Sequence, residues 1–369
     1  MTDLHQNLRQ NLIDLMLTPG LSGHEERVAA LIRARLPVGL QTRTDRLGNL
    51  IATIPGNPEA PSVMLFTHMD QLGFIVRRVE TDGLIRVERL GGVSERALAA
   101  QAVVLCTPQG DIPGIIMNKA HHATTPDEKY RVLPTPDLRI DTGHGSKTAV
   151  ESAGIRIGTP VILRPQVIEL AGNRIAGTAI DDRAGCAMLI EVAHRLTADN
   201  RAANPGPTVH LVWSVLEEFN LRGAVVAAQN LHPDIALQVD LMLATDTPDM
   251  ADRGEMVLGG GPGISLYSFH GRGTLNGVIP HPALVRLFED TAAAQAIPLQ
   301  RSAQTGVLTD LSYVQLLGDG VAALDIGFPM RHSHSALECC DLGDVAALTR
   351  LTLAALAAIT PGFSLSREV

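Results

Sequence analysis

The feature that most constrains the fold is an apolar run that ends in two adjacent carboxylates. The run covers residues 209–216 (VHLVWSVL), and Glu217 and Glu218 follow it directly. Its β-branched and aromatic residues predict a buried strand, and ligands bind at the C-terminal ends of such strands in open α/β sheets. Because neighbouring residues on a strand point to opposite faces, we expect the two glutamates to have different roles. The alternative is an acidic loop that is exposed to solvent.

Polar residues stand at the ends of several other predicted strands or at a helix start. Apolar strands are predicted at 62–67, 241–245 and 321–326, and a helix is predicted over 183–196. The polar residues beside these elements and after the 209–216 run are His68, Asp70, Asp181, Asp182, Glu217, Glu218, Asp246 and His334. Imidazole and carboxylate groups suit Zn²⁺ or Co²⁺, and a carboxylate can bridge two ions. Each residue alone has an ordinary explanation, since Asp182 is also a typical helix N-cap, but the joint pattern indicates a metal site.

The pattern of apolar and polar residues along the chain predicts two structural parts. Residues 1–72 and 166–369 alternate helical patterns with apolar strands, which is typical of an α/β fold. Residues 73–165 contain short alternating runs that Gly, Pro and Asp turns separate, with little helical signal. We therefore expect a discontinuous α/β domain that an inserted β-rich domain interrupts.

Composition argues against several classes of partner. The 369 residues carry a net charge of −9 without a basic run, which argues against nucleic acid and anionic membrane surfaces. No apolar run reaches transmembrane length, and the N-terminus lacks a signal-peptide pattern. The four cysteines, at positions 106, 186, 339 and 340, have no disulfide-framework spacing. A reducing cytoplasm is therefore the expected location.

The chain resembles the tetrahedral (TET) aminopeptidases, a family of dimetal metallopeptidases that includes glutamyl, leucyl and deblocking enzymes, some of them labelled endoglucanase. The matching stretches follow one another along nearly the whole chain, and their combination is specific. They are 19–25 (PGLSGHE), 68–74 (HMDQLGF), 179–183 (AIDDR), 217–224 (EEFNLRGA), 246–247 (DT) and 331–335 (RHSHS), with Glu338 after the last. The resemblance implies a mixed-sheet catalytic domain, residues 1–72 and 166–369, and a barrel-like dimerisation domain, residues 73–165.

Carried over position by position, the resemblance implies a site for two divalent metal ions, Zn²⁺ or Co²⁺, with Mn²⁺ as a third option. It implies that Asp181 bridges the two ions. His68 and Asp246 then complete the ligand set of one ion, and Glu218 and His334 complete the ligand set of the other.

The resemblance also implies the catalytic roles. Glu217 is the general base, Asp70 orients His68, and the Asp181–Asp182 peptide is cis as in relatives. A water that two divalent ions acidify would attack the peptide carbonyl, and Glu217 would pass its proton to the departing amine. The implied protein is an aminopeptidase of short peptides, built from dimers that assemble into a tetrahedral dodecamer.

The sequence departs from the family pattern at a few positions. Gln71 stands where the family usually has Glu, and Phe219-Asn220 replaces the common Val-Gly. We expect Phe219 to pack against the sheet, with narrowing of the pocket as the alternative. His332 is a rival ligand on the same strand face as His334, and the family register favours His334.

Three other functions remain open at this point. A related dimetal amidohydrolase, such as a deacylase or carboxypeptidase, would use the same catalytic fold, but an aminopeptidase alone requires a free α-amine on its substrate. An endoglucanase needs two carboxylates that flank the glycosidic bond, which adjacent strand residues do not provide, and aromatics make up only 3% of the chain. A cage or binding protein with a relic site is the third alternative.

Overall fold

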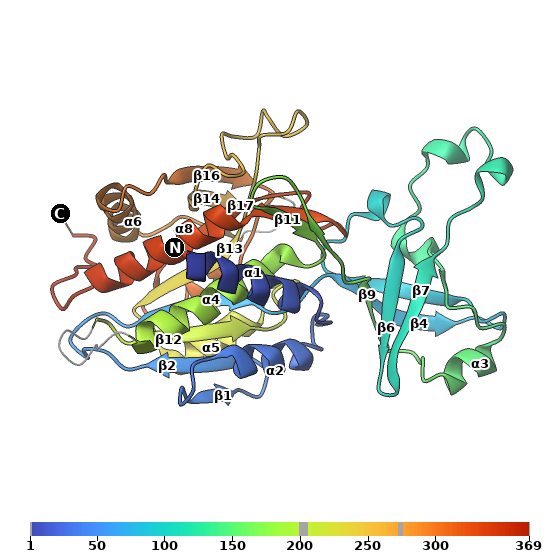
Figure 1. The fold of residues 1–369 in the computed structure, drawn as a ribbon, viewed down its shortest axis with the longest axis horizontal. Coiled ribbons are helices and arrows are strands. Elements are labelled where there is room, and N and C mark those ends of the chain that lie inside the picture. Colours follow the sequence, from blue (N-terminus) through green and yellow to red (C-terminus); the bar gives the residue numbers. More distant parts are fainter. Residues whose placement is uncertain (1, 199–205, 272–275, 369) are drawn as a thin grey trace.

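The computed structural model describes residues 2–198, 206–271 and 276–368 and divides them between two parts (Figure 1). An α/β part contains both termini, and a β-barrel lies at the other end of the long axis. The described strands of the α/β part are β1 (Thr42–Thr44), β2 (Leu50–Ile54), β3 (Val63–His68), β10 (Val167–Glu169), β11 (Arg174–Gly177), β12 (Val209–Ser214), β13 (Ile235–Leu243), β14 (Gly263–Phe269), β15 (Gly277–Val278), β16 (Gln300–Thr305), β17 (Ala322–Arg331) and β18 (Glu338–Asp341).

Four parallel strands form the centre of a mixed sheet. Among the described residues the strand order is β1-β2-β12-β3-β13-β17-β18-β11-β10, and β14 branches from β17 and pairs with β15 and β16. The neighbours β12, β3, β13 and β17 are parallel, whereas the outer pairs are antiparallel. β3 is buried along its whole length, as expected for a parallel strand that is covered on both faces. The carboxyl ends of the four central strands therefore meet at one edge of the sheet.

Helices cover both faces of this sheet. The described helices of the α/β part are α1 (Thr2–Met16), α2 (Glu26–Arg35), α4 (Ile180–Ala198), α5 (Gly223–Leu231), α6 (Pro282–Ala294), α7 (Leu311–Val314) and α8 (Leu342–Ala358). The main core joins α1, α4 and α8 to one face of the sheet, with Leu12, Leu189 and Leu348 buried in it. A smaller core joins α5 and α7 to the other face through Ala227 and Leu311. α4 is buried on all sides from Ile180 to Ala193, which agrees with its apolar stretch at residues 184–190.

The second part is a closed barrel with its own core. Its strands, in order around the barrel, are β4 (Gly73–Val79), β5 (Ile85–Leu90), β8 (Ile140–Asp141), β7 (Gly110–Ile116), β6 (Ala102–Thr107) and β9 (Pro160–Leu163). Phe74, Ile140 and Val161 fill its interior, and the short helix α3 (Lys147–Ser152) lies beside it. The predicted fold class, a mixed α/β unit with a barrel-like β-rich part, is confirmed; the role of the barrel in dimerisation stays a prediction.

One strand differs from the prediction in a way that affects the site. The sequence predicts a strand at 241–245 that ends before Asp246, but β13 occupies Ile235–Leu243. Asp240 therefore lies inside the strand, and Asp246 lies three residues beyond its end. The predicted strand starts too late because Gln238 and Asp240 are polar and interrupt the apolar pattern, although both side chains are buried.

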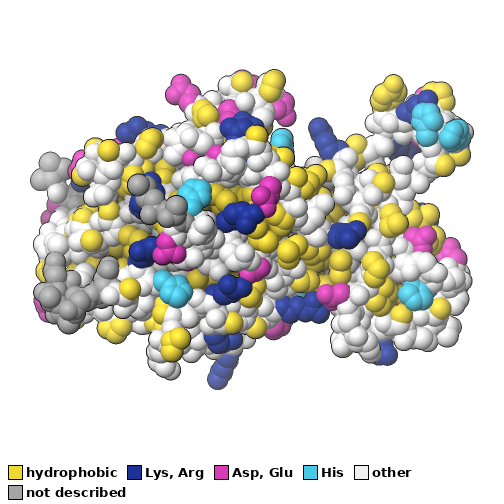
Figure 2. Space-filling model, in the orientation of Figure 1, with side chains coloured by type: hydrophobic (Ala, Val, Ile, Leu, Met, Phe, Trp, Pro, Cys, Tyr) yellow, Lys and Arg dark blue, Asp and Glu magenta, His cyan; other side chains and the backbone are white. Residues whose placement is uncertain are grey.

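The surface and the helices give limited information on partners. Figure 2 shows acidic and basic side chains interspersed over the face in view. Within the described ranges, no helix is both long enough and apolar enough to span a membrane. Arg27 of α2 and Asp111 of β7 form an ion pair between the two parts of the molecule, in which Arg27 donates to both carboxylate oxygens at 2.7 and 2.9 Å.

Candidate metal centre

The polar residues that the sequence singles out converge at the carboxyl edge of the parallel strands. His68 is the last residue of β3, Glu217 and Glu218 follow β12, and His334 follows β17. Asp181 reaches the same place from the start of α4, where Asp181 and Asp182 are not helical. The expected cis peptide between Asp181 and Asp182 is present.

Asp181 lies between the two histidines. Its Oδ1 is 3.0 Å from His68 Nε2, and its Oδ2 is 3.4 Å from His334 Nε2. His334 Nε2 is in turn 3.7 Å from Glu218 Oε1. A carboxylate that offers one oxygen to each of two imidazoles has the arrangement that a bridging ligand needs.

Two groups of ligand atoms are compact enough to hold a metal ion. Asp181, Glu218 and His334 form one group, and the other consists of His68, Asp182 and Asp240; the atoms of each lie within 4.8 Å of one another. Both oxygens of Asp182 are already engaged, one by the Thr67 hydroxyl and one by Gly185 N at 3.0 Å. Asp181 is therefore the better ligand of the two aspartates.

Asp246 does not join this cluster, which corrects the predicted ligand set. Its two oxygens accept from Arg331 Nε at 2.8 Å and Nη2 at 2.7 Å, and one also accepts from Leu258 N at 2.9 Å. Asp240 of β13 lies beside His68 instead. An acid inside the apolar run of residues 235–243 is the sequence signal that could have identified it.

Asp70 fixes the turn that carries the two glutamates. Its Oδ1 accepts from Glu217 N and its Oδ2 from Glu218 N, both at 3.0 Å, and Ser22 Oγ donates to Oδ2 at 2.6 Å. His68 Nδ1 lies 3.2 Å from the Asp70 carbonyl and 3.4 Å from Oδ1. These contacts on Nδ1 leave Nε2 of His68 free to face the cluster.

The barrel also contributes to the cluster. His334 Nδ1 is 3.0 Å from the carbonyl oxygen of Gly92, in the segment between β5 and β6. A Cβ on Gly92 would lie 2.9 Å from this nitrogen, so the contact requires glycine. Glu338 links the backbones of His334 and Asp181. Its carboxylate accepts from His334 N at 2.9 Å and from Asp181 N at 3.0 Å. Neither role is predicted from the sequence.

Electrostatics shows that the cluster carries an excess of acids. Burial raises the pKa of Glu218 to about 7 and that of Glu217 well above its usual value; the nearby charges of Glu218, Asp240 and Asp310 raise the latter further. Burial tends to lower the pKa of His68, but hydrogen bonds to Asp181 and Asp70 outweigh it and raise this pKa well above normal.

The donor set fits divalent cations. Glu218 Oε1 is buried without a hydrogen-bond partner in the part of the chain that the structure describes. Bound cations would satisfy this oxygen and reduce the repulsion between the carboxylates. Nitrogen and oxygen ligands of this kind are those that Zn²⁺ and Co²⁺ accept.

Three other singled-out residues lie apart from the cluster. His332 is exposed and acts electrostatically on Asp249, so it does not compete with His334. The expected packing of Phe219 against the sheet is not found; the residue is 43% exposed, with the Arg222 guanidinium 4.9 Å from its ring centre. Gln71 accepts a hydrogen bond from Gly20 N at 3.1 Å, which is a structural role.

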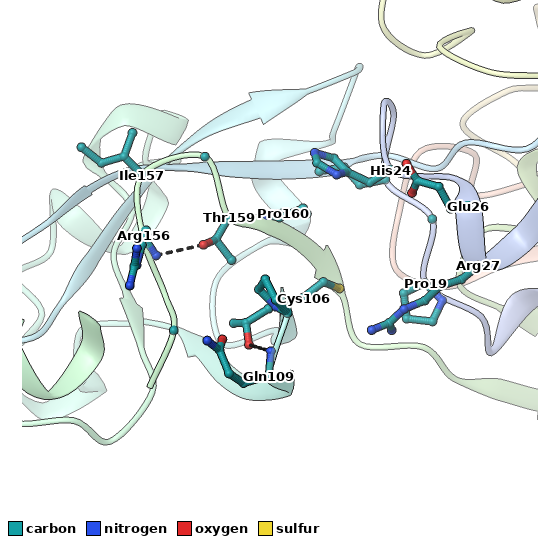
Figure 3. Close-up of a pocket in the computed structure, with 16 residues that line it drawn as sticks. Pro19, His24, Glu26, Arg27, Cys106, Gln109, Arg156, Ile157, Thr159 and Pro160 are labelled. Carbon is teal, nitrogen blue, oxygen red and sulfur yellow. Dashed lines mark hydrogen bonds between the residues drawn. The ribbon is translucent and has the colours of Figure 1, made fainter. Parts of the chain in front are cut away.

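A surface hollow of about 510 Å³ lies away from this centre, between the N-terminal segment and the barrel. Figure 3 shows Pro19, His24 and Arg27 on one side and Cys106 and Gln109 on the other. The guanidinium of Arg27 is already paired with Asp111. The metal-ligand cluster is therefore the stronger candidate for chemistry.

Comparison with known proteins agrees with the fold and the cluster. The M42 glutamyl aminopeptidase family matches residues 48–351. The putative aminopeptidase SgcX of Escherichia coli (strain K12) is 36% identical over 356 residues, which cover 96% of this chain and 94% of that protein. Among solved structures, aminopeptidase APDkam598 from the archaeon Desulfurococcus kamchatkensis superposes with a TM-score of 0.89 at 32% identity and 97% coverage of both chains.

A second solved structure is relevant to assembly. It is the TET1 peptidase of Pyrococcus horikoshii, whose description states that it can assemble into a tetrahedron or a large octahedral shell. It superposes with a TM-score of 0.83 at 26% identity, with coverage of 94% of this chain and 98% of that one.

Fold and site together define a peptidase, an enzyme that hydrolyses peptide bonds. The chain belongs to the M42 glutamyl aminopeptidase family, which confirms the predicted resemblance to the TET aminopeptidases.

Proposed function

We propose that this protein is a metal-dependent aminopeptidase that removes N-terminal residues from short peptides. The observation that carries the proposal is the position of Asp181, which offers one oxygen to His68 and the other to His334. Glu217 stands beside this group, with its Oε2 4.0 Å from His68 Nε2.

The proposed ligand set comes from five elements. Asp181, His68 and Asp240 would hold one divalent ion, and Asp181, Glu218 and His334 would hold the other. When bound, divalent ions supply Lewis acidity that acidifies water and polarises a peptide carbonyl. We expect Zn²⁺ or Co²⁺, with Mn²⁺ as a third option, because the ligands are imidazole and carboxylate groups.

Glu217 is the proposed general base. Burial raises its pKa above the usual value, which makes its carboxylate a stronger base. It accepts a proton from the attacking water and passes it to the amine that leaves. Asp70 holds the Glu217 backbone through the hydrogen bond from Glu217 N, so it acts as a positioning residue.

A panel of aminoacyl-p-nitroanilides with N-acetylated counterparts tests this function. The protein is stripped with EDTA and then supplied with Zn²⁺, Co²⁺ or Mn²⁺. Metal-restored cleavage of the free-amine substrates alone is the expected result. Cleavage of the acetylated substrates would instead identify a deacylase or endopeptidase, and inactivity with every metal would contradict the proposal.

We also propose that the chain forms homo-oligomers through the barrel and functions in the cytoplasm. The structural likeness to a peptidase that assembles into closed shells supports assembly into dimers and then a tetrahedral dodecamer. Light scattering on the purified protein would distinguish a monomer, a dimer and a dodecamer. A monomer at every concentration would contradict the assembly.

A further inference from the structure

Gln238 is a buried amide on the strand that carries the proposed ligand Asp240. It lies two residues before Asp240 on β13, and its side chain is fully buried. Side chains two residues apart on a strand point to the same face of the sheet. Ala236, two residues earlier, belongs to the core under α5 and α7, so Gln238 and Asp240 face the same layer.

An amide in this position is costly unless its polar atoms have partners. β13 lies between β3 and β17, and Gln238 is opposite Phe66 in the first and Asp325 in the second. A methionine of similar size would fill the same space without that cost. The contacts of the amide therefore indicate why a glutamine stands among apolar residues here.

The oxygen of the amide holds the start of α7. Gln238 Oε1 accepts from Leu311 N at 3.0 Å, and Leu311 is the first residue of that helix. The first N–H groups of a helix have no partner inside it, and within the described residues the side chain of Asp310 does not cap α7. This bond also fixes the orientation of the amide, because an NH2 group in place of Oε1 would face another donor.

The nitrogen of the amide consequently faces the proposed ligand. Gln238 Nε2 donates to Asp240 Oδ2 at 3.1 Å. The other oxygen of this carboxylate, Oδ1, accepts from Leu241 N at 2.6 Å. Each carboxylate oxygen has two lone pairs, so each keeps one for an ion. The two bonds together fix the rotation of the carboxylate beside His68.

The histidine ligand of the same proposed ion is held in a similar way. His68 Nδ1 lies 3.2 Å from the carbonyl oxygen of Asp70 and 3.4 Å from its Oδ1. A ligand that is oriented before the ion arrives binds it more tightly, because less freedom is lost on binding. Capping of α7 would require only the oxygen of Gln238, whereas its nitrogen is directed at Asp240.

We propose that Gln238 is a positioning residue that orients Asp240 and thereby sets the affinity of the ion beside His68. The proposal rests on the metal-dependent function proposed above and adds a residue outside its ligand set. Removal of the amide would leave the Asp240 carboxylate with the bond from Leu241 N alone. The ion should therefore bind more weakly without being lost.

Gln238→Met tests this role, because it removes the amide at similar side-chain size. The variant and the wild-type protein are stripped with EDTA and titrated calorimetrically with Co²⁺, which gives an affinity for each ion. One of the two affinities should fall by about 10–10²-fold in the variant, and the other should stay unchanged. Two unchanged affinities would overturn the proposal, and so would equal losses for both ions.

Gln304→Met is the matched control. Gln304 is also a buried glutamine, and its Nε2 donates to the backbone carbonyl oxygen of Leu243 at 3.4 Å. This variant should bind both ions as the wild-type protein does. An affinity loss as large as that of Gln238→Met would show that any buried glutamine has this effect, and it would overturn the proposal.

Thermal unfolding distinguishes positioning from capping. Gln238→Met also leaves Leu311 N without its acceptor, so its melting temperature should fall. A lower melting temperature with wild-type affinities for both ions would reduce Gln238 to a cap of α7 and overturn the proposal. If this variant fails to fold, Gln238→Ala leaves space for a water at Leu311 N but does not fix Asp240. It should lower the same affinity, and an unchanged affinity would count against the proposal.

Ion binding and turnover keep the two proposals distinct. If the wild-type protein binds two ions but cleaves no free-amine substrate, the aminopeptidase function fails, and the titration still decides the role of Gln238. If it cleaves these substrates and Gln238→Met binds both ions with wild-type affinity, only the role of Gln238 fails. A wild-type protein that binds no divalent ion would contradict both.

Discussion

Asp70 accepts the backbone N–H of Glu217 at 3.0 Å, and through this bond the end of β3 fixes the end of β12. The other oxygen of Asp70 accepts from Glu218 N, also at 3.0 Å. The adjacent glutamates therefore have a fixed backbone, while their side chains reach different partners. His68 lies near Glu217, and His334 lies near Glu218.

Asp70→Asn should lower kcat by about 10–10²-fold with little change in KM, because an amide cannot accept both backbone donors. Steady-state kinetics of the metal-loaded variant provides the measurement. Asp234→Asn is the control: Asp234 accepts from Ser62 N at 2.7 Å and Ser62 Oγ at 2.8 Å just before β13, at the edge of the sheet opposite the cluster. The control should lose stability but keep kcat. A normal kcat in Asp70→Asn would show that Glu217 does not depend on this bond.

Glu217→Gln should retain metal and lower kcat by about 10²–10⁴-fold, the usual contribution of a general base. The amide keeps the size of the side chain but cannot accept a proton from water. Elemental analysis of the purified variant and single-turnover kinetics provide the two readouts. A rate close to that of the wild-type protein would remove Glu217 from the mechanism, and loss of metal would indicate that it is a ligand.

The positions of site residues that lie next to a strand or helix in the sequence were predictable from local patterns. His68 and Asp70 follow an apolar strand, and the spacing of Glu217 and Glu218 after a second strand indicates the same edge of the sheet. Asp240 was not predicted as a ligand because Gln238 and Asp240 interrupt the apolar pattern of the strand that contains them, so the strand was predicted too late in the sequence. The helix predicted over 183–196 lies within α4, since helix starts carry local signals.

Contacts between distant segments were not predictable in this way. Gly92 is 242 positions from His334 in the sequence, and nothing near either residue indicates that they meet. Asp325 lies in an apolar strand pattern, and only the folded chain places it in a cavity with Gln304 and Ser268. The strand pairing of the barrel was unpredictable for the same reason, because the barrel closes through pairs of strands that are far apart in sequence.

The corrected ligand gives a comparison between two aspartates six positions apart. Asp240→Asn should reduce the metal content by about one ion per chain, because the amide is a weak ligand for a divalent cation. Asp246→Asn should keep full metal content, since Asp246 is paired with Arg331. Mass spectrometry of both proteins after dialysis against metal-free buffer provides the measurement. Metal loss in Asp246→Asn alone would restore the original assignment.

Gly92→Ala should weaken the binding of the ion that Glu218 and His334 are proposed to hold. The new Cβ would lie 2.9 Å from His334 Nδ1, so the imidazole must move. An affinity lower by about 10-fold is expected for the weaker-bound ion, measured by titration of the stripped protein. Gly145→Ala is a matched control in the barrel part, because no heavy atom lies within 4 Å of its Cβ position. Equal affinities in the two variants would show that the barrel does not position His334.

Asp325 should make stability depend on pH in a predictable direction. Burial raises its pKa from 3.8 to about 7, so the folded state binds the proton more tightly than the unfolded state. Its stabilising contribution is complete below about pH 4 and is lost as pH rises through about 7, by at most about 4 kcal/mol. Asp325→Asn cannot titrate, so its free energy of unfolding relative to wild type should increase between pH 5 and 8. Urea unfolding of the metal-loaded proteins measures this difference, with the exposed Asp290→Asn expected to track wild type. A difference that stays constant over this range would place the Asp325 carboxylate in solvent.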